Sequence, residues 1–363
     1  MMKSELETPS LLIDYDKMLK NIIAMQNVAD ESEIALRPHI KTHKCPQIAK
    51  LQQTRGALGV CTQTLGESEV MIASGLKNVF LTNHVVGKSK IDRLIKLEMA
   101  GSVQVAVDSL TNVRKIGAVS QTCSQTVPVL LEVNVGMGSY WCGVPVGRNV
   151  VNLAREISRV KGVLLIGVMT YEGVLPYRVT DQRRRTKVVQ KLIAKLVRCA
   201  EEIRKNGQEI EVVSCGSTST AKAAASVPGV TEIQPGNYVF YDLDQVKMGS
   251  ANLENCALTV QSTVISMPGT NTVVVDAGIK AFCHDQGMFP RIVNSPGLTP
   301  IEIYEEQLVL RSTARARKLQ IGDKLEFIPF HACTASNMHD QFNVARGDEV
   351  VATWPIAARG KMS

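Results

Sequence analysis

The hydrophobic positions of the first two thirds of the chain fall in short runs that are apolar on both faces, separated by longer amphipathic stretches. Short, uniformly apolar runs are typical of strands in a buried parallel sheet, and amphipathic stretches are typical of surface helices. The candidate strands are IALRP (34–38), ALGVC (57–61), NVFLT (78–82), SVQVAV (102–107), PVLLEVN (128–134), VLLIGV (163–168), IEVVS (210–214) and VTEIQ (230–234). The candidate helices are 64–75, 88–99, 147–160 and 180–206. This alternation predicts a TIM-type (β/α)8 barrel, with a doubly wound open sheet as the alternative.

The pattern changes after about residue 250, where strands separated by turn residues follow one another without long helices. The candidate strands there are ALTVQSTVISM (257–267), TNTVVVDAG (270–278), EQLVLRS (306–312), DKLEFIPF (323–330) and EVVATWP (349–355). Such an arrangement is typical of an antiparallel sheet. We therefore expect an α/β barrel over residues 11–250 and a C-terminal antiparallel β domain over 251–363, to which residues 1–10 also belong.

Composition and charge narrow the classes of partner. The chain is 45% hydrophobic and 21% charged, which is ordinary for a globular protein, and its formal net charge is +7. Its Lys and Arg residues are scattered, with RRR at 183–185 as the tight run, so we expect no nucleic-acid partner. No window approaches the roughly 18 apolar residues of a membrane span, so we expect no membrane partner. Residues 1–16 lack the layout of a secretion signal, and the nine cysteines form no CxxC, so we expect a cytoplasmic protein.

Polar residues and glycines gather directly after the predicted strands, where (β/α)8 barrels carry their active sites. The loops after the seventh and eighth strands, at 214–220 and 235–238, often bind phosphate in such barrels. Ser217 and Thr218 offer hydroxyl donors, and the turn at Gly236 lets the backbone approach a ligand closely. A helix cap and a tight turn explain either loop alone, but two such loops at these strands favour a phosphate site.

Lys41 follows the first predicted strand, within the cationic segment RPHIKTHK at 37–44. A lysine in this place is more often a solvated loop residue. Neighbouring cations and partial burial, however, favour the uncharged amine that forms an imine with an aldehyde. A barrel closes on itself, so an aldehyde whose phosphate is held by the last two loops can reach a lysine of the first strand. Together the lysine and the phosphate site indicate pyridoxal 5′-phosphate, whose ring accepts the electrons released at a substrate α-carbon.

Several motifs in one order resemble those of the fold-type III pyridoxal phosphate enzymes. The similarity is greatest to the branch of D-threonine aldolases and D-serine or 3-hydroxyaspartate dehydratases, which is built on an alanine racemase N-terminal-type barrel. The motifs extend over nearly the whole chain and are TPSLLIDYDKMLKNI (8–22), RPHIKTHKCP (37–46), GVCTQTLGESEV (59–70), LTNHVVG (81–87), VSCGSTSTA (213–221), IQPGNYVFYD (233–242), VVVDAG (273–278) and FHACTASNMHD (330–340). The resemblance implies a homodimer in which barrel and β domain pair head to tail.

The resemblance also implies the residues of the site. Lys41 holds the cofactor covalently. Contacts with the phosphate or the ring come from Gln63, Tyr171, Thr218, Gly236, Asn237 and Tyr238. A divalent metal lies beside the cofactor, bound by a His-x-Asp or His-x-Cys motif that reads His331-Ala332-Cys333 here.

The chemistry of His331 and Cys333 suits that role, although a buried histidine near a core cysteine is the commoner explanation of such a pair. On a strand or extended loop, residues two apart point the same way, so an imidazole and a thiolate can bind one ion. Two protein ligands leave positions for water and for the β-hydroxyl of a substrate, which the metal would polarise. A thiolate ligand favours zinc, whereas a carboxylate would suit manganese or magnesium better.

Two segments depart from the family pattern. The loop GMGSYWCGV at 136–144 has Trp141 where relatives usually carry an arginine that contacts the cofactor ring oxygen, and it has two extra residues. A Glu-His pair common before the metal segment reads Glu306-Gln307. Because of Trp141, cofactor electronics or substrate fit are expected to differ from those of the relatives, and no histidine general acid or base is expected at Gln307.

Two reactions of a small β-hydroxy-D-amino acid fit these residues. A retro-aldol cleavage gives glycine and an aldehyde, and a dehydration gives a 2-oxo acid and ammonia. The motif set is closer to the D-threonine aldolases, whereas His-x-Cys is similar to the dehydratase pattern, so we favour the aldolase and keep the dehydratase as the alternative. A non-catalytic pyridoxal phosphate-binding protein is the alternative from another class, although it would need neither a second domain nor a metal motif.

Overall fold

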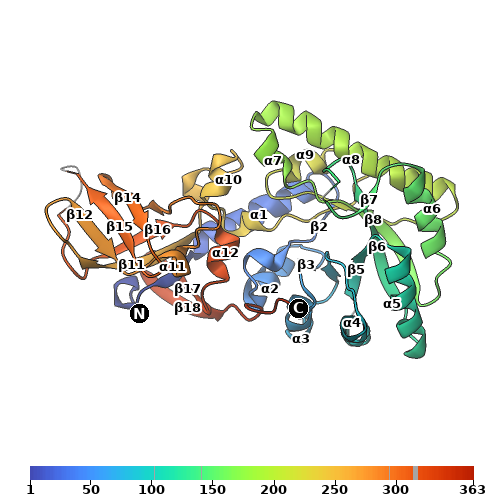
Figure 1. Cartoon of the computed structure of the whole chain (residues 1–363), viewed down its shortest axis with the longest axis horizontal. Coiled ribbons are helices and arrows are strands. Elements are labelled where there is room, and N and C mark those ends of the chain that lie inside the picture. Colours follow the sequence, from blue (N-terminus) through green and yellow to red (C-terminus); the bar gives the residue numbers. More distant parts are fainter. Residues whose placement is uncertain (102, 140, 294, 314–317) are drawn as a thin grey trace. The chain divides into compact units, whose positions relative to one another are not determined.

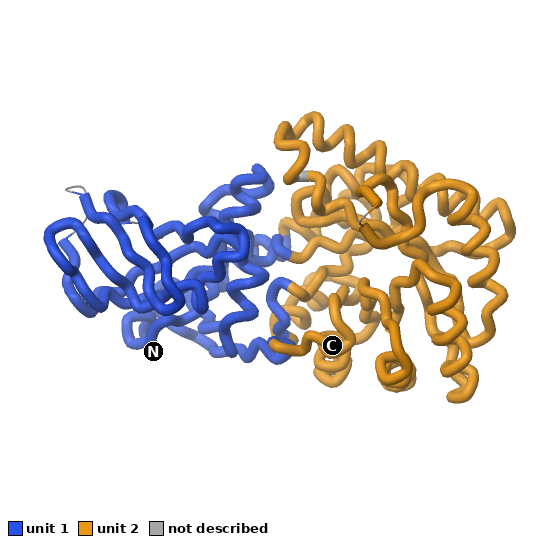
Figure 2. The backbone as a smooth tube through the Cα atoms, in the orientation of Figure 1, with its two compact units in different colours: residues 1–23, 42–45, 237–359 blue, residues 24–41, 46–236, 360–363 orange. Residues whose placement is uncertain are grey.

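The computed structural model describes residues 1–101, 103–139, 141–293, 295–313 and 318–363. The chain forms two compact units (Figure 2). Unit 1 comprises residues 1–23, 42–45 and 237–359, and unit 2 comprises residues 24–41, 46–236 and 360–363. This division differs from the expected boundaries after residues 10 and 250. Strand β1 (Ser10–Asp14) pairs within the sheet of unit 1, and segment 237–250 hydrogen-bonds to that unit through Asp244, whose N–H donates to the Phe330 carbonyl.

Unit 2 contains a curled, barrel-like sheet of eight parallel strands. They are β2 (Ala35–Leu36), β3 (Val60–Thr62), β4 (Val79–Leu81), β5 (Val103–Val107), β6 (Val127–Asn134), β8 (Val163–Met169), β9 (Val212–Cys215) and β10 (Glu232–Ile233). Their order is β2-β10-β9-β8-β6-β5-β4-β3, and a parallel bridge between His39 and Cys61 joins the two ends. The eight predicted strands are therefore confirmed, except that Ser102 lies outside the described residues. The short β7 (Val144–Pro145) pairs with β6.

Helices lie around the outside of this sheet (Figure 1). They are α2 (Pro46–Thr54), α3 (Leu65–Ala73), α4 (Lys88–Gly101), α5 (Leu110–Thr122), α6 (Arg148–Ile157), α7 (Leu175–Arg178), α8 (Gln182–Lys205) and α9 (Ala221–Ala225), while α1 (Tyr15–Asp30) contributes to both units. In α8, Val189, Ile193 and Leu196 recur at helical spacing and are fully buried, which explains why this charged sequence packs against the sheet. The four predicted helices are confirmed. Among the described residues, no helix combines the length and apolar character needed to span a bilayer.

The core inside the curled sheet consists of apolar side chains from five neighbouring strands. They are Cys61, Phe80, Ala106, Leu130 and Met169, each at most 2% exposed. This filled interior leaves the ends of the strands as the places where polar side chains collect.

Unit 1 contains a mostly antiparallel sheet in the order β14-β15-β12-β11-β1-β17-β18, with β16 pairing β11 and β13. Its remaining strands are β11 (Leu258–Ser266), β12 (Thr272–Val275), β13 (Arg291–Ile292), β14 (Leu298–Ile303), β15 (Leu308–Ser312), β16 (Lys324–Ile328), β17 (Gln341–Arg346) and β18 (Glu349–Pro355). The helices α10 (Leu243–Lys247), α11 (Ile279–Phe282) and α12 (Ala332–Ser336) are short. The predicted β domain is confirmed, with the correction that β1 joins it in parallel to β17.

Candidate functional site

Lys41 lies in the 3-10 helix η2 (Ile40–Thr42), which is separated from the end of β2 by three residues. Its side chain is half-buried, and its Nζ is 5.2 Å from the centroid of the Tyr171 ring, which follows β8. Within the described part of the chain, no carboxylate forms an ion pair with this amine. The structure therefore brings together two of the predicted cofactor residues from distant strands of unit 2.

Trp141 stacks on the same Tyr171 ring, with centroids 5.6 Å apart and planes inclined by 24°. The loop that carries it is held by the side chain of Asn134 at the end of β6. Asn134 Oδ1 accepts the backbone N–H groups of residues 136 and 137 at 3.1 and 2.8 Å, and its Nδ2 donates to the Trp141 carbonyl at 3.3 Å. Where relatives are expected to place an arginine, this chain thus places an aromatic stack. Tyr140, in the same loop, lies outside the described residues.

The cations around Lys41 are paired, contrary to the crowding that the sequence suggests. Arg37 is 2% exposed, and its Nη2 is 3.0 Å from the equally buried Glu232 carboxylate. Lys44 Nζ donates to Asn337 Oδ1 at 3.0 Å, and His39 Nε2 is 3.1 Å from the Thr82 hydroxyl. Arg37 therefore has a structural role in the core of unit 2, because a carboxylate from β10 neutralises its charge.

The loop between β9 and α9 is folded over a buried carboxylate, that of Glu172. This carboxylate accepts the Gly216 N–H at 3.2 Å and the Thr220 hydroxyl, and Ser217 N–H donates to Thr220 Oγ1 at 2.8 Å. Burial raises the pKa of Glu172, although these hydrogen bonds oppose the rise. Thr218 lies half-buried in the same loop. Glu172 thus fixes the loop that the sequence predicts to bind phosphate, and no sequence signal connects the two segments.

The other predicted cofactor residues also follow strands of the curled sheet. Gln63 comes directly after β3, and its N–H donates to Glu67 at 2.6 Å. Pro235 lies in the loop after β10, and its carbonyl accepts the His39 N–H at 3.0 Å, which connects the eighth strand to the first. Of the predicted set, Lys41, Gln63, Tyr171, Ser217, Thr218 and Gly236 belong to unit 2, and Asn237 and Tyr238 belong to unit 1.

His331 and Cys333 lie together in unit 1, but not on a strand as expected. His331 directly precedes α12 in extended backbone, and Cys333 lies in the first turn of that helix. Burial opposes the charge on each group, yet the hydrogen bond between them raises the pKa of His331 to about 10 and lowers the pKa of Cys333. Thr42 Oγ1 is 3.1 Å from Cys333 Sγ and also favours the thiolate. Without a metal, these shifts therefore favour a protonated imidazole beside a thiolate.

Two aspartates that the sequence analysis missed hold this pair. Asp285 Oδ2 is 2.7 Å from His331 Nδ1. Asp242 is fully buried and accepts the Ala332 N–H at 2.8 Å and Asn237 Nδ2 at 2.6 Å. Asp242 lies within the motif at 233–242 and could have been noticed there, whereas nothing in the sequence marks Asp285.

The described residues contain no cluster of three or more His, Cys, Asp or Glu side chains that could hold a metal ion. Any metal at His331 and Cys333 would therefore have two protein ligands and open positions.

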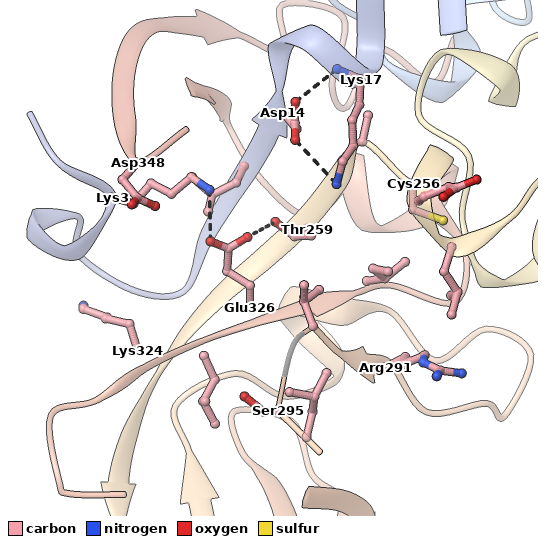
Figure 3. Close-up of a pocket in the computed structure, with 18 of the residues that line it drawn as sticks. Lys3, Asp14, Lys17, Cys256, Thr259, Arg291, Ser295, Lys324, Glu326 and Asp348 are labelled. Carbon is pink, nitrogen blue, oxygen red and sulfur yellow. Dashed lines mark hydrogen bonds and ion pairs between the residues drawn. The ribbon is translucent and has the colours of Figure 1, made fainter. Parts of the chain in front are cut away.

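A cavity of about 960 Å³ lies elsewhere in unit 1 (Figure 3). Charged side chains line it, among them the ion pairs of Lys3 with Glu326 at 3.1 Å and of Lys17 with Asp14 at 3.5 Å. None of the predicted site residues lines this cavity. We therefore assign no function to this cavity on the basis of its size.

Two family models match the chain. The model of the alanine racemase N-terminal domain matches residues 13–244, and that of a putative serine dehydratase domain matches residues 257–345. Among curated proteins, a D-threonine aldolase of Arthrobacter sp. is 34% identical over 98% of this chain and 94% of that protein.

Solved structures agree with this assignment. The D-threonine aldolase of Filomicrobium marinum is 30% identical, with a TM-score of 0.91 over 98% of this chain and 96% of that one. The D-threo-3-hydroxyaspartate dehydratase of Delftia sp. is 28% identical, with a TM-score of 0.88 over 98% of both chains. Solved variants of a D-threo-3-hydroxyaspartate dehydratase include one with a histidine replaced by alanine, and a metal-free one with the cysteine two positions later replaced by alanine.

Proposed function

This chain belongs to the alanine racemase N-terminal domain family, in its branch of D-amino-acid aldolases and dehydratases, and from that premise we propose that it is a lyase of β-hydroxy-D-amino acids that depends on pyridoxal phosphate and a divalent metal. Within that branch we propose the retro-aldol reaction, which releases glycine and an aldehyde. The observation that carries this choice is the 34% identity to a D-threonine aldolase over 98% of the chain.

The donor set of unit 2 fits pyridoxal phosphate. Lys41 offers a half-buried amine beside the Tyr171 ring, and the loop of Ser217 and Thr218 offers hydroxyl and backbone donors for a phosphate. Lys41 would hold the aldehyde, and Gly236 would let the backbone approach the phosphate. Gln63 and Tyr171 would contact the ring or its substituents, and the family resemblance gives the same role to Asn237 and Tyr238. When bound, the cofactor would supply an acceptor for the electrons of the bond broken at the substrate α-carbon.

The donor set of unit 1 fits a soft divalent metal. Asp285 occupies Nδ1 of His331, which leaves Nε2 for a metal, and the pKa of Cys333 is lowered towards the thiolate that such an ion requires. A thiolate and an imidazole together favour zinc over manganese or magnesium. When bound, the ion would act as a Lewis acid towards the substrate β-hydroxyl.

Residues of this chain would position the substrate and move protons. With the substrate bound, the amine of Lys41 would carry a proton to or from the substrate α-carbon. The stacked rings of Trp141 and Tyr171 provide an apolar wall beside that amine, which keeps water from the reacting carbon.

Dehydration to a 2-oxo acid and ammonia is the second candidate reaction. It is supported by His331 and Cys333, which have the same spacing as the histidine and cysteine replaced in the solved variants of a D-threo-3-hydroxyaspartate dehydratase. In this reaction Lys41 Nζ would remove the proton from the α-carbon before the hydroxyl leaves.

Product analysis separates these reactions. The protein, loaded with pyridoxal phosphate and zinc, is incubated separately with D-threonine and D-serine. We expect acetaldehyde and glycine from D-threonine, and loss of turnover after chelation of the metal. Formation of a 2-oxo acid and ammonia instead would identify a dehydratase. No turnover of either substrate, or of 3-hydroxy-D-aspartate, with metal present would support a non-catalytic binding protein and contradict the proposal.

We also propose that the chain forms a homodimer in the cytoplasm. The dimer follows from the resemblance to the family, and the nine cysteines, all free thiols in the structure, support a reducing compartment. Light scattering coupled to gel filtration is expected to give the mass of two chains. A fully active species with the mass of one chain would contradict the dimer.

A further inference from the structure

The side chain of Asp285 collects three donors in the turn that follows α11. Its Oδ2 is 2.7 Å from His331 Nδ1 and accepts the Thr334 hydroxyl at 3.0 Å, and its Oδ1 accepts the Cys283 thiol at 3.0 Å. Cys283 has a φ of 64°, in the left-handed region that non-glycine residues rarely adopt, so the turn is bent to bring the carboxylate here. None of the recognised motifs contains Asp285.

We propose that Asp285 is a positioning residue for the metal site: by accepting a hydrogen bond from His331 Nδ1, it fixes the tautomer and the ring orientation that present Nε2 to the ion held with Cys333. This inference rests on the metal site proposed above. It deepens that proposal by adding a residue that does not touch the metal.

The chemistry of imidazole supports this role. A neutral imidazole carries one N–H, and the nitrogen that donates it cannot ligate a metal at the same time. A carboxylate that accepts from Nδ1 therefore leaves the lone pair on Nε2 and makes that nitrogen more basic. Such carboxylate partners of ligating histidines are worth about 10–100-fold in metal affinity.

The contact between Asp285 and His331 differs from an ordinary ion pair on the surface, in which both side chains move freely in solvent. The side chains of Asp285 and His331 are only 36% and 26% exposed. Thr334, one turn along α12, contacts both the Asp285 carboxylate and His331 Nδ1, at 3.0 and 3.2 Å. The carboxylate is thus held in one orientation by groups from α12 and from its own turn, and the imidazole has little freedom to rotate.

Cobalt binding tests the inference without any assay of activity. The metal-free full-length protein is titrated with Co²⁺ and then with Zn²⁺ in competition, and the absorption of the cobalt–thiolate pair reports occupancy. Asp285→Ala should weaken binding of both ions about 10–100-fold. It should give the wild-type spectrum at saturating cobalt, because His331 and Cys333 remain the ligands. Asp285→Asn should recover part of the affinity, since its amide oxygen still accepts from Nδ1.

Matched variants distinguish failure of this inference from failure of the proposed metal site. Glu306→Ala removes an exposed carboxylate from the same unit and should leave cobalt affinity unchanged. Wild-type affinity in Asp285→Ala would overturn the inference, and so would an altered spectrum at saturation, which would make Asp285 itself a ligand. If instead the wild type gives no cobalt–thiolate band, or Cys333→Ala binds as tightly as the wild type, the metal site of the proposed function is wrong. Circular dichroism of the metal-free variants controls for folding.

Discussion

Replacing Lys41 by alanine should leave the purified protein colourless after incubation with pyridoxal phosphate, and should lower kcat for the best substrate by about 10²–10⁴-fold. The amine of Lys41 is half-buried, faces the Tyr171 ring at 5.2 Å and has no carboxylate partner in the described part of the chain. Removing it takes away both the covalent anchor of the aldehyde and the group that carries the α-carbon proton. The yellow absorption of the lysine-bound cofactor measures the first loss, and steady-state kinetics with D-threonine measure the second.

Lys44→Ala is the matched control for this variant. Lys44 lies in the same cationic segment, but its Nζ donates to Asn337, so the variant should retain the colour of the wild type. Borohydride reduction followed by peptide mass spectrometry places the cofactor directly, and we expect the label on Lys41. A label on another lysine, or a coloured Lys41→Ala protein, would refute the assignment of the anchor.

Much of the fold could be predicted because the buried strands of unit 2 are nearly pure apolar runs. Strands with mixed character were missed. In β14, most side chains are partly or fully exposed and Pro300 precedes a register shift, so no clear alternation is present. In β17, the buried Asn343 interrupts the apolar pattern, and its oxygen accepts the Thr353 hydroxyl of the neighbouring strand at 3.4 Å. β1 was not recognised as a separate strand, and most of it fell within the expected bounds of the barrel, 11–250, although it pairs with β11 and β17.

The candidate site could be predicted only where the residue type and its local motif were informative. Lys41, His331 and Cys333 were found in this way. The groups that hold them were missed because each contact joins segments far apart in the chain: His331 and Asp285 are 46 residues apart, and Glu172 and Thr220 are 48 apart.

The same limit explains the misinterpretation of the cationic segment. The sequence shows Arg37 beside Lys41, but it does not show the carboxylate of Glu232, 195 residues away, that pairs with Arg37. The spacing of His331 and Cys333 also led to a wrong prediction of the backbone conformation of the metal motif. A strand would align residues two apart, whereas here the helix α12 begins at Ala332, and the imidazole and thiol meet across its first turn.

Arg37→Ala should lower the free energy of unfolding by about 3–5 kcal/mol, the cost of leaving one partner of a buried ion pair without the other. Arg37, directly after β2, and Glu232, in β10, are each 2% exposed, and these two strands pair in the curled sheet. The guanidinium also donates to the Asn78 carbonyl at 2.7 Å, so the variant removes a second buried hydrogen bond. After the change, the Glu232 carboxylate still accepts the Ser214 hydroxyl at 2.7 Å, but this neutral donor does not neutralise its charge. Urea unfolding at neutral pH, followed by circular dichroism, measures the loss.

A double variant separates the cost of the unpaired charge from the loss of packing around Arg37. Replacing both partners, as Arg37→Met with Glu232→Leu, removes the buried charges together and should recover most of the stability, because apolar groups of similar volume often substitute for a buried ion pair at no net cost. Lys280→Ala, which breaks an exposed ion pair with Glu306, should leave the urea midpoint almost unchanged. If Arg37→Ala unfolds at the same urea concentration as the wild type, the ion pair does not stabilise the curled sheet. If the double variant is no more stable than Arg37→Ala, the loss comes from packing rather than from the uncompensated carboxylate.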